Sequence, residues 1–350
     1  MPQKTIYILH KNGAPSHYYG LVYLAKKEGI EIKFREFSVF SKLYKSILKG
    51  NFKQLKKQFI NAAFLLNLLV SSNKKIVVGI APFDAKLKNL LPFLIKHQLY
   101  YHTSWTCWDT SFHPKRKGNS PKIFGIWKAF LETHAKHIFT VTKKSKMSIL
   151  EHYNISNNTI SVVHHSLHPA FETHTPTTRL PLSFLFVGRL TNDKGIDKLL
   201  EFATQNPKAK VTFIGEGKEE NTIVSYSKKF DNIQFMGYIS NKNELKKALS
   251  IHQYLVLNSQ KTKTWEELFG LIIIEAMSQG TLPIATNHSG PKEIIDASFG
   301  FLFEEGEITA TLAKIIENNP FLIAMSQKAI AASKKYYQAE ISKKWHPILN

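Results

Sequence analysis

The chain has 350 residues, a hydrophobic fraction of 43% and a formal net charge of +21. This length exceeds one typical hydrophobic core, so we expect two domains, and the composition is that of an ordinary globular protein. Cys107 is the only cysteine, which excludes an intrachain disulfide and fits a reducing compartment. Residues 1–4 lead into a strand-like run without the layout of a signal peptide, so a cytoplasmic location is expected.

The positive charge is concentrated in the first half of the chain. Residues 1–170 contain 26 Lys and Arg against 7 Asp and Glu, whereas residues 171–350 contain 21 against 19. Such asymmetry favours a polyanionic partner for the first half. A solvated, lysine-rich face explains it equally well.

Apolar runs in the first half predict five strands separated by helices. The strands are expected over Thr5–Leu9, Lys75–Ala81, Leu99–His102, His137–Val141 and Ile160–His164, with helices over Lys122–His134 and Lys143–His152. The longest apolar run, Phe59–Val70, is too short to span a bilayer. We interpret it as a core helix, with a helix at a membrane interface as the alternative.

The same alternation begins again near Ser183 and predicts a second domain. Its strands are expected over Ser183–Val187, Lys210–Ile214, Asn232–Met236, Tyr254–Leu257 and Leu282–Ala285, with helices over Ile196–Thr204 and Asn243–Ser250. The intervening segment, residues 172–181, lacks periodicity and is typical of a linker. The prediction is an α/β protein with two doubly wound, Rossmann-like domains, residues 1–171 and 182–350, facing across a cleft. The last helix could return to the first domain.

Two carboxylates, Glu267 and Glu275, bracket a Phe-Gly turn and an apolar helix. An ionised Glu275 within such a helix is costly unless a ligand pairs with it, and the adjacent hydroxyls of a ribose would do so. The alternative is a Glu275 that reaches solvent from the helix edge. Gly270 precedes the helix, so its first N–H groups could meet phosphate oxygens. Eight helical residues would span about 12 Å, enough to place a sugar and a ribose at opposite ends.

Two cations, Arg189 and Lys194, lie between a strand that ends at Gly188 and a helix that begins near Ile196. In open α/β sheets ligands bind at such strand ends, and the two cations suit a diphosphate. The alternative is a pair of solvated surface cations. A glycine turn, Gly215–Gly217, follows the next strand.

These segments resemble the family 4 retaining glycosyltransferases of the two-domain GT-B fold. The resemblance covers roughly the second half and is carried by the Glu-x7-Glu spacing of Glu267 and Glu275 and by a Gly-Arg-Leu…Lys-Gly element at 188–195. It implies that Arg189 and Lys194 bind the donor diphosphate. It also implies Glu275 on the ribose hydroxyls, Glu267 near the donor sugar as a catalytic residue, and donor contacts at the backbone of Phe269, Gly270 and Leu271.

The first half resembles the family more loosely. Gly13 belongs to a loop similar to the family's glycine loop and is expected to bind the donor, although Ala14 replaces the second glycine. His102 ends a strand and resembles the family's active-site histidine. Residues 289–293 resemble a Gly-Gly-x-x-Glu element in which Ser289 replaces the first glycine. His164, His165 and His168 suggest a metal cluster, but the family has a polar loop there, so no metal is expected.

The predicted activity is retaining transfer of a hexose from a nucleotide-sugar donor to a glycan or lipid-linked acceptor, in surface polysaccharide or glycolipid synthesis. Cations and helix N–H groups would stabilise the leaving diphosphate without a cofactor or metal. One rival is a nucleotide-sugar epimerase of the same fold. The other is a non-enzymatic, basic nucleic-acid-binding protein, but the chain carries no recognised motif of that class, so no nucleic acid is expected as partner.

Six lysines precede the apolar run: Lys42, Lys45, Lys49, Lys53, Lys56 and Lys57. At spacings of three or four residues, many of them share one helix face. Basic residues near an anionic membrane contribute about 1 kcal/mol each. We therefore expect peripheral binding to the inner face of the membrane, with a solvated face and a soluble acceptor as the alternative.

Overall fold

A computed structural model of the chain describes residues 4–11, 15–48, 50–109, 120–174, 176–262, 265–318 and 323–350. The chain divides into two compact units. Unit 1 consists of Met1–Ser166 and Gln338–Asn350, and unit 2 consists of Leu167–Tyr337. No helix among the described residues is long and apolar enough to cross a bilayer.

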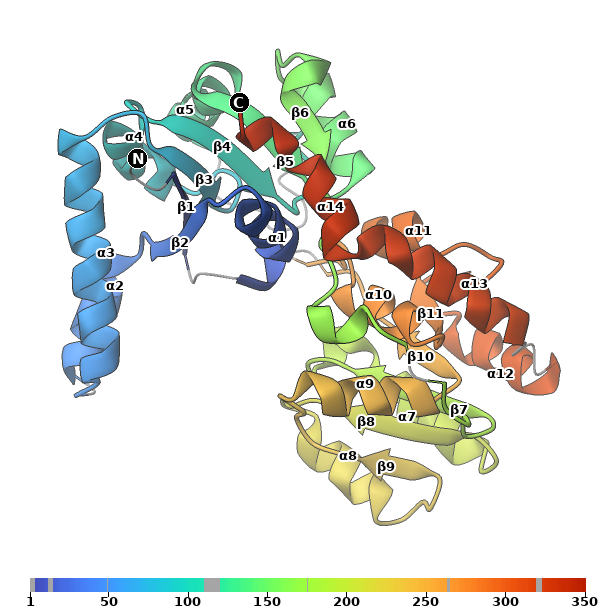
Figure 1. The fold of residues 1–350 in the computed structure, drawn as a ribbon. Coiled ribbons are helices and arrows are strands. Elements are labelled where there is room, and N and C mark those ends of the chain that lie inside the picture. The colour runs from blue at the N-terminus through green and yellow to red at the C-terminus, as the bar shows by residue number, and fades with distance from the viewer. Residues whose placement is uncertain are drawn as a thin grey trace. The chain divides into compact units, whose positions relative to one another are not determined.

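Unit 1 is built on a six-stranded parallel sheet with the order β2-β1-β3-β4-β5-β6 (Figure 1). All five predicted strands are present. The sheet also contains β2, which the sequence did not predict because its alternating charges leave most of the strand only half-buried. The strands are β1 (Thr5–His10), β2 (Glu31–Glu36), β3 (Lys75–Gly79), β4 (Gln98–Thr103), β5 (Ala135–Thr140) and β6 (Ile160–Val162).

The helices of unit 1 connect these strands and pack against the sheet. They are α1 (Tyr19–Lys27), α2 (Val39–Leu48), α3 (Phe52–Val70), α4 (Lys86–Leu94), α5 (Pro121–Ala129) and α6 (Lys143–His152), with the short turns η1 (Pro15–Tyr18), η2 (Phe130–His134) and η3 (Asn157–Thr159). The expectation of a core helix over Phe59–Val70 is confirmed only in part, because Phe64 and Leu68 join the core while the other side of the helix is exposed. Only one side of α3 is buried, and Phe59 and Leu66 are more than 60% exposed.

Unit 2 contains a second six-stranded parallel sheet with the order β12-β11-β10-β7-β8-β9. Its strands are β7 (Ser183–Val187), β8 (Lys210–Ile214), β9 (Ile233–Phe235), β10 (Tyr254–Leu257), β11 (Leu282–Thr286) and β12 (Phe301–Phe303). The five predicted strands are present, and the sixth, β12, is too short to give a sequence pattern. The helices are α7 (Ile196–Gln205), α8 (Glu220–Ser227), α9 (Lys242–Ile251), α10 (Leu271–Ser278), α11 (Ser289–Ile294), α12 (Ile308–Asn318) and α13 (Ile323–Ser333), with η4 (Pro169–Phe171), η5 (Asn192–Lys194) and η6 (Lys334–Tyr336).

Unit 2 begins at Leu167, ahead of the segment 172–181 that the sequence marks as a linker. Hydrogen bonds hold that segment to unit 2. The side-chain amide of Gln279 donates to the carbonyl of Thr173 at 3.2 Å. The backbone N–H of Leu180 donates to the carbonyl of Ile251 at 2.8 Å. A lack of periodicity therefore reflects irregular backbone here and not a free connection.

The last thirteen residues form α14 (Gln338–Lys344) and η7 (His346–Ile348) and belong to unit 1, where α14 packs on α1 (Figure 1). Trp345 is 1% exposed, and its ring centroid lies 4.4 Å from that of Phe139 in β5. The ammonium of Lys75 in β3 donates to the carbonyls of Ile348 and Leu349 at 2.7 and 2.6 Å. The end of the chain thus contributes to the core of the first sheet.

Candidate functional site

Two loops at the carboxyl ends of β7 and β8 pack directly on each other. The backbone N–H of Leu190 donates to the carbonyl of Glu216 at 2.9 Å. A side chain at Gly215 or Gly217 would overlap the carbonyl oxygens of Gly188 or Leu190. Both glycines are therefore required for the close approach. The Gly215–Gly217 turn supports the loop that carries Arg189.

Lys194 is buried where three separate segments of unit 2 meet. Its Nζ donates to Oε2 of Glu267 at 2.9 Å and to Oγ of Ser259 at 3.2 Å. The same atom lies 3.9 Å from the ring centroid of Trp265, which adds a cation–π contact. The structure thus brings Lys194 and Glu267, predicted separately from the sequence, into one ion pair.

Arg189 has a contrasting environment. Its side chain is 64% exposed and forms a long ion pair with Asp193, with Nη2 3.9 Å from Oδ2. An exposed ion pair of that length contributes little to stability. The guanidinium is therefore accessible to an anionic ligand and can turn toward one at little cost.

The backbone around Glu267 is held by neighbouring loops. Its N–H donates to Nδ1 of His288 at 3.3 Å, which places the ring proton on Nε2, 2.7 Å from Oε1 of Glu305. The N–H of Gly290 donates to the carbonyl of Glu267 at 3.2 Å. A side chain at Gly290 would overlap the backbone of Phe269. In the segment that resembles Gly-Gly-x-x-Glu, only the second glycine, Gly290, is present, and packing requires a glycine at that position.

A glycine turn leads into α10. Gly270 is the N-cap and has a φ of +88°, in the left-handed region that favours glycine. Phe269 is 4% exposed and packs edge-on against Tyr336, with ring centroids 6.1 Å apart. The N–H of Ile273 donates to the carbonyl of Gly270 at 2.9 Å, whereas a helix has no internal acceptor for its first two N–H groups, those of Leu271 and Ile272, and the helix dipole adds partial positive charge there.

Glu275 lies in α10 with a side chain that is 12% exposed, so it does not reach solvent freely. Burial raises its pKa to about 7, although Lys242, whose Nζ lies 3.6 Å from Oε1, acts in the opposite direction. A buried acid that changes ionisation near neutral pH is a typical feature of a functional site. The structure pairs Glu275 with Lys242 and Glu267 with Lys194, in two separate contacts.

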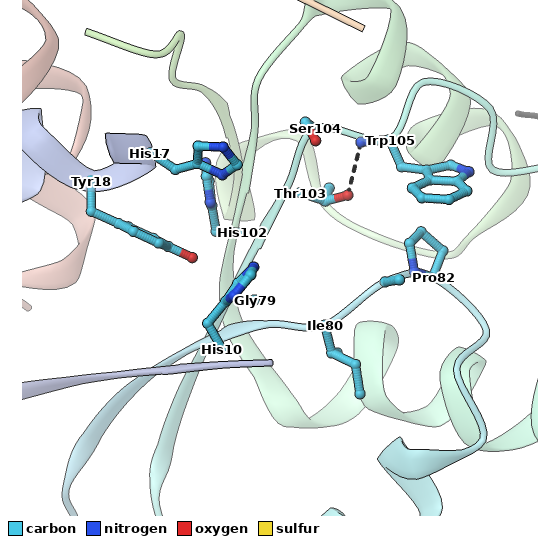
Figure 2. Close-up of a pocket in the computed structure, with 11 residues that line it drawn as sticks. His10, His17, Tyr18, Gly79, Ile80, Pro82, His102, Thr103, Ser104 and Trp105 are labelled. Atoms are coloured by element: carbon cyan, nitrogen blue, oxygen red, sulfur yellow. Dashed lines mark hydrogen bonds between the residues drawn. The ribbon is translucent and has the colours of Figure 1, made fainter. Parts of the chain in front are cut away.

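Unit 1 has a cavity of about 160 Å³ at the carboxyl edge of its sheet (Figure 2). His102 is 5% exposed, with its ring centroid 4.9 Å from that of Tyr18 and 5.3 Å from that of Trp345. Nε2 of His102 and the hydroxyl of Tyr18 are buried without a hydrogen-bond partner among the described residues. The cavity is lined by His10, His17, Tyr18, Gly79, Ile80, Ala81, Pro82, His102, Thr103, Ser104 and Trp105.

The histidines of this cavity are uncharged at neutral pH. Burial lowers the pKa of His102 to about 3 and that of His10 to about 4, with further lowering from neighbouring histidines. Burial also lowers the pKa of His17. Neutral imidazoles and hydroxyls donate and accept hydrogen bonds without charge, which suits sugar hydroxyls. A side chain at Gly79 would come 2.6 Å from Cδ2 of His10 and 2.7 Å from the Tyr18 hydroxyl, so the glycine keeps the cavity open.

Gly13, expected to bind the donor, lies outside the described residues. Among the residues that the structure describes, no three His, Cys, Asp or Glu side chains form a group that could hold a metal ion. The sequence reasoning did not single out His10 or Ser259. Both could have been found, because His10 ends β1 and Ser259 follows β10, and strand ends were the criterion used elsewhere.

Comparison with known proteins connects unit 2 with sugar transfer. Residues 179–335 match the family model described as glycosyl transferases group 1. Sulfoquinovosyl transferase SQD2 of Arabidopsis thaliana is 28% identical over 137 residues, which are 37% of this chain and 25% of that protein. The O-antigen biosynthesis glycosyltransferase WbnH of Escherichia coli is 22% identical over 281 residues, 79% of this chain and 77% of the relative. The chain spans about a quarter of the length of SQD2.

The fold extends this similarity to both units. The crystal structure of Anabaena HepE in complex with UDP-glucose has a TM-score of 0.67 and 16% identity, and the alignment covers 99% of each chain. With two parallel six-stranded sheets, the predicted fold class of two Rossmann-like domains of the GT-B type is confirmed. Residues 179–335 therefore resemble the glycosyl transferases of group 1, and the chain shares its fold with HepE.

Proposed function

We propose that the protein is a retaining glycosyltransferase of family 4 that takes a hexose from a nucleotide-sugar donor held by unit 2. The observation that carries this proposal is the cluster at the strand ends of unit 2. There the buried Lys194 pairs with Glu267, which lies on the segment that leads through Gly270 into α10, and the buried Glu275 of α10 has a pKa near neutrality. Core packing alone gives no reason for these charges.

In this proposal the diphosphate of the donor binds Arg189, Lys194 and the first N–H groups of α10. The exposed guanidinium of Arg189 needs no rearrangement of the core to reach a phosphate. Lys194 would exchange part of its contact with Glu267 for a phosphate oxygen. Glu275 would accept hydrogen bonds from ribose hydroxyls, Glu267 would lie near the sugar, and the backbone at 269–271 would complete the donor site.

The reaction breaks the bond between the anomeric carbon and the leaving phosphate oxygen, and the bonding electrons stay with the diphosphate. The acceptor hydroxyl forms its new bond on the same face, and its proton passes to the leaving phosphate. Cationic side chains and helix N–H groups stabilise the developing charge, so no divalent metal is required in this proposal. His102 contributes a neutral imidazole, with an unpartnered Nε2 to accept from or donate to a sugar hydroxyl.

The proposed acceptor is a glycan or lipid-linked sugar in surface polysaccharide or glycolipid synthesis, which the role of WbnH in O-antigen biosynthesis supports. The proposed location is cytoplasmic, at the inner face of the membrane. The surplus of 19 positive charges in residues 1–170 supports contact with an anionic surface there.

A donor screen tests the proposal. Purified protein is incubated with a panel of radiolabelled nucleotide sugars, with and without candidate acceptors, in the presence of EDTA. We expect acceptor-dependent release of the nucleoside diphosphate with retention of the anomeric configuration, read by NMR. Isomerisation of a donor without any acceptor would support an epimerase instead. Loss of turnover in EDTA that manganese or magnesium restores would refute the metal-free mechanism.

A further inference from the structure

The helical hairpin formed by α2 and α3 carries an exposed apolar face. Of the large hydrophobic side chains exposed among the described residues, half lie in these two helices. They are Tyr44, Ile47, Leu48, Phe52, Phe59, Ile60, Leu66, Leu69 and Val70, with Phe52 at 79% and Val70 at 85% exposure. An apolar patch of this extent marks a binding surface rather than ordinary surface variation.

The exposed residues of α3 follow the helical repeat. Phe52, Phe59 and Leu66 recur every seven residues, and Lys56 and Val70 fall on the same side of the helix. The opposite side, with Gln58, Asn61, Phe64 and Leu68, is buried. The helix therefore buries two amides beside Phe64 and Leu68 and leaves the rings of Phe52 and Phe59 in solvent.

A buried polar network fixes this orientation. The Glu36 carboxylate at the end of β2 accepts hydrogen bonds from Lys42 at 2.9 Å, Lys57 at 2.7 Å and the Gln58 amide at 2.9 Å. The backbone N–H of Glu36 donates to Oδ1 of Asn61 at 3.2 Å. Rotating α3 to bury Phe59 would remove two of these three hydrogen bonds, those from Lys57 and Gln58, from the buried Glu36 carboxylate, which is costly.

The charge of the hairpin identifies what covers this face. Residues 39–70 contain six lysines and no acidic residue. A second copy of the same face would bring like charges together, whereas an anionic bilayer complements them. The hairpin cannot insert across a bilayer, because α3 contains three lysines and none of the described helices qualifies as a membrane span. An amphipathic helix of this type lies in the plane of the interface.

We propose that the apolar face of the α2–α3 hairpin docks unit 1 on an anionic lipid surface, with Phe52, Phe59, Leu66 and Val70 buried at the headgroup boundary. This inference specifies the surface behind the proposed membrane location, yet it rests on unit 1 alone. It also adds apolar contact to the purely electrostatic binding to the membrane that the lysines alone would predict. Two of the six lysines, Lys42 and Lys57, are engaged with Glu36, so apolar contact must contribute alongside charge.

Vesicle flotation tests the docking surface. The full chain is floated with vesicles of phosphatidylcholine alone or with 30% phosphatidylglycerol. The test variant is the double substitution Phe59→Gln and Leu66→Gln. The control is Met147→Gln, which removes an equally exposed apolar side chain, 63%, from α6 of the same unit. We expect the wild type and the control to float with anionic vesicles, and the vesicle partition of the double variant to fall at least tenfold.

Each other outcome overturns the proposal. Flotation of the double variant like the wild type would show that this face is not the contact, and equal flotation with neutral vesicles would refute the anionic partner. A wild-type dimer in light scattering that the double variant loses would identify a second copy as the occupant. Donor turnover with a water-soluble acceptor is measured on the same variants. Loss of vesicle binding with normal turnover concerns the docking surface alone, and absent turnover with normal vesicle binding concerns the proposed function alone.

Discussion

At the scale of single residues, the ion pairs of Lys194 and of Arg189 in unit 2 differ in what they offer a ligand. Lys194 and Glu267 satisfy each other at 2.9 Å, while Arg189 is largely exposed. A ligand gains more from a charge that is preorganised but not already neutralised. Replacing Arg189 should therefore weaken ligand binding while leaving the free energy of unfolding almost unchanged.

The first prediction concerns Arg189→Ala. Loss of one charge-assisted contact to the developing phosphate charge should lower kcat/KM by about two to three orders of magnitude, or about 2.7–4 kcal/mol, with unchanged unfolding. The control, Lys198→Ala, removes an exposed cation that pairs with Glu201 in α7. Near-normal turnover by Arg189→Ala would contradict the donor-site assignment.

The second prediction concerns Glu275. Burial raises its folded-state pKa to about 7 from an ordinary value of 4.5. Between these values the folded state keeps the proton and the unfolded state releases it, so the free energy of unfolding falls as pH rises through this window. Glu275→Gln should therefore exceed the wild type in stability at pH 8 by about 2–3 kcal/mol and match it below pH 4.5.

Urea unfolding of both proteins at pH 4 and pH 8 measures this difference. Glu244→Gln, a change at an exposed position of α9, supplies the control. A Glu275→Gln variant that is less stable than the wild type at pH 8 would show that the ion pair with Lys242 outweighs burial. Reduced donor turnover in the same variant would accompany the gain in stability if the carboxylate binds ribose.

Sequence reasoning located the charged residues of unit 2 but not their partners. Strand ends and the Glu-x7-Glu spacing placed Lys194 and Glu267 in one predicted site, because such patterns are local. The direct contact between them spans 73 residues of sequence and depends on how β10 and η5 align. Likewise, an isolated His102 was visible in the sequence, but its contact with Tyr18 and Trp345 requires the folded sheet.

At the scale of secondary-structure elements, β2 and α3 depend on one carboxylate. Glu36 has a side chain that is 5% exposed. Burial acts to raise its pKa, but hydrogen bonds from Lys57, Lys42 and Gln58 lower it to about 2. The resulting stability is present above pH 4.5 and is lost as pH falls toward 2, because the folded state binds the proton more weakly than the unfolded state.

The third prediction follows from this anchor. Glu36→Gln should lower the free energy of unfolding by about 3 kcal/mol at pH 7 and by less at pH 3. Glu31→Gln on the same strand removes an exposed ion pair with Lys33 and should cost at most about 1 kcal/mol. Urea unfolding at both pH values tests the pair. Equal losses from the two variants would contradict the anchoring role of Glu36.

The elements themselves were largely predictable. All ten predicted strands are present, because parallel strands buried on both faces give continuous apolar runs. The interpretation of Phe59–Val70 as a core helix holds for Phe64 and Leu68 but not for the exposed side of the helix. Glu36 accepts a hydrogen bond from the Gln58 amide and donates its backbone N–H to Asn61, which sets the side that is buried, and no local pattern reports a partner that lies 22 to 25 residues away.

At the scale of the whole molecule, the first unit is completed only by the last residues of the chain. The fourth prediction is that Trp345→Ala destabilises unit 1 by about 3–5 kcal/mol, since the ring is fully buried against Phe139. Hydrogen exchange read by mass spectrometry should accelerate in β4 and β5 while β10 and β11 stay unchanged. Ile323→Ala, at a position 75% exposed, is the control. Acceleration confined to unit 2 would contradict the assignment of the chain end to unit 1.

This return of the chain also sets an order for folding during synthesis. Lys75 can donate to the carbonyl of Ile348 only after another 273 residues have been translated, and all of unit 2 lies between them. Unit 2 is contiguous, so it can fold while unit 1 still lacks Trp345 and exposes Phe139. Contacts of such high sequence separation form late, because loop closure must precede them. We therefore expect the nascent first unit, rather than the second, to depend on chaperones on the ribosome.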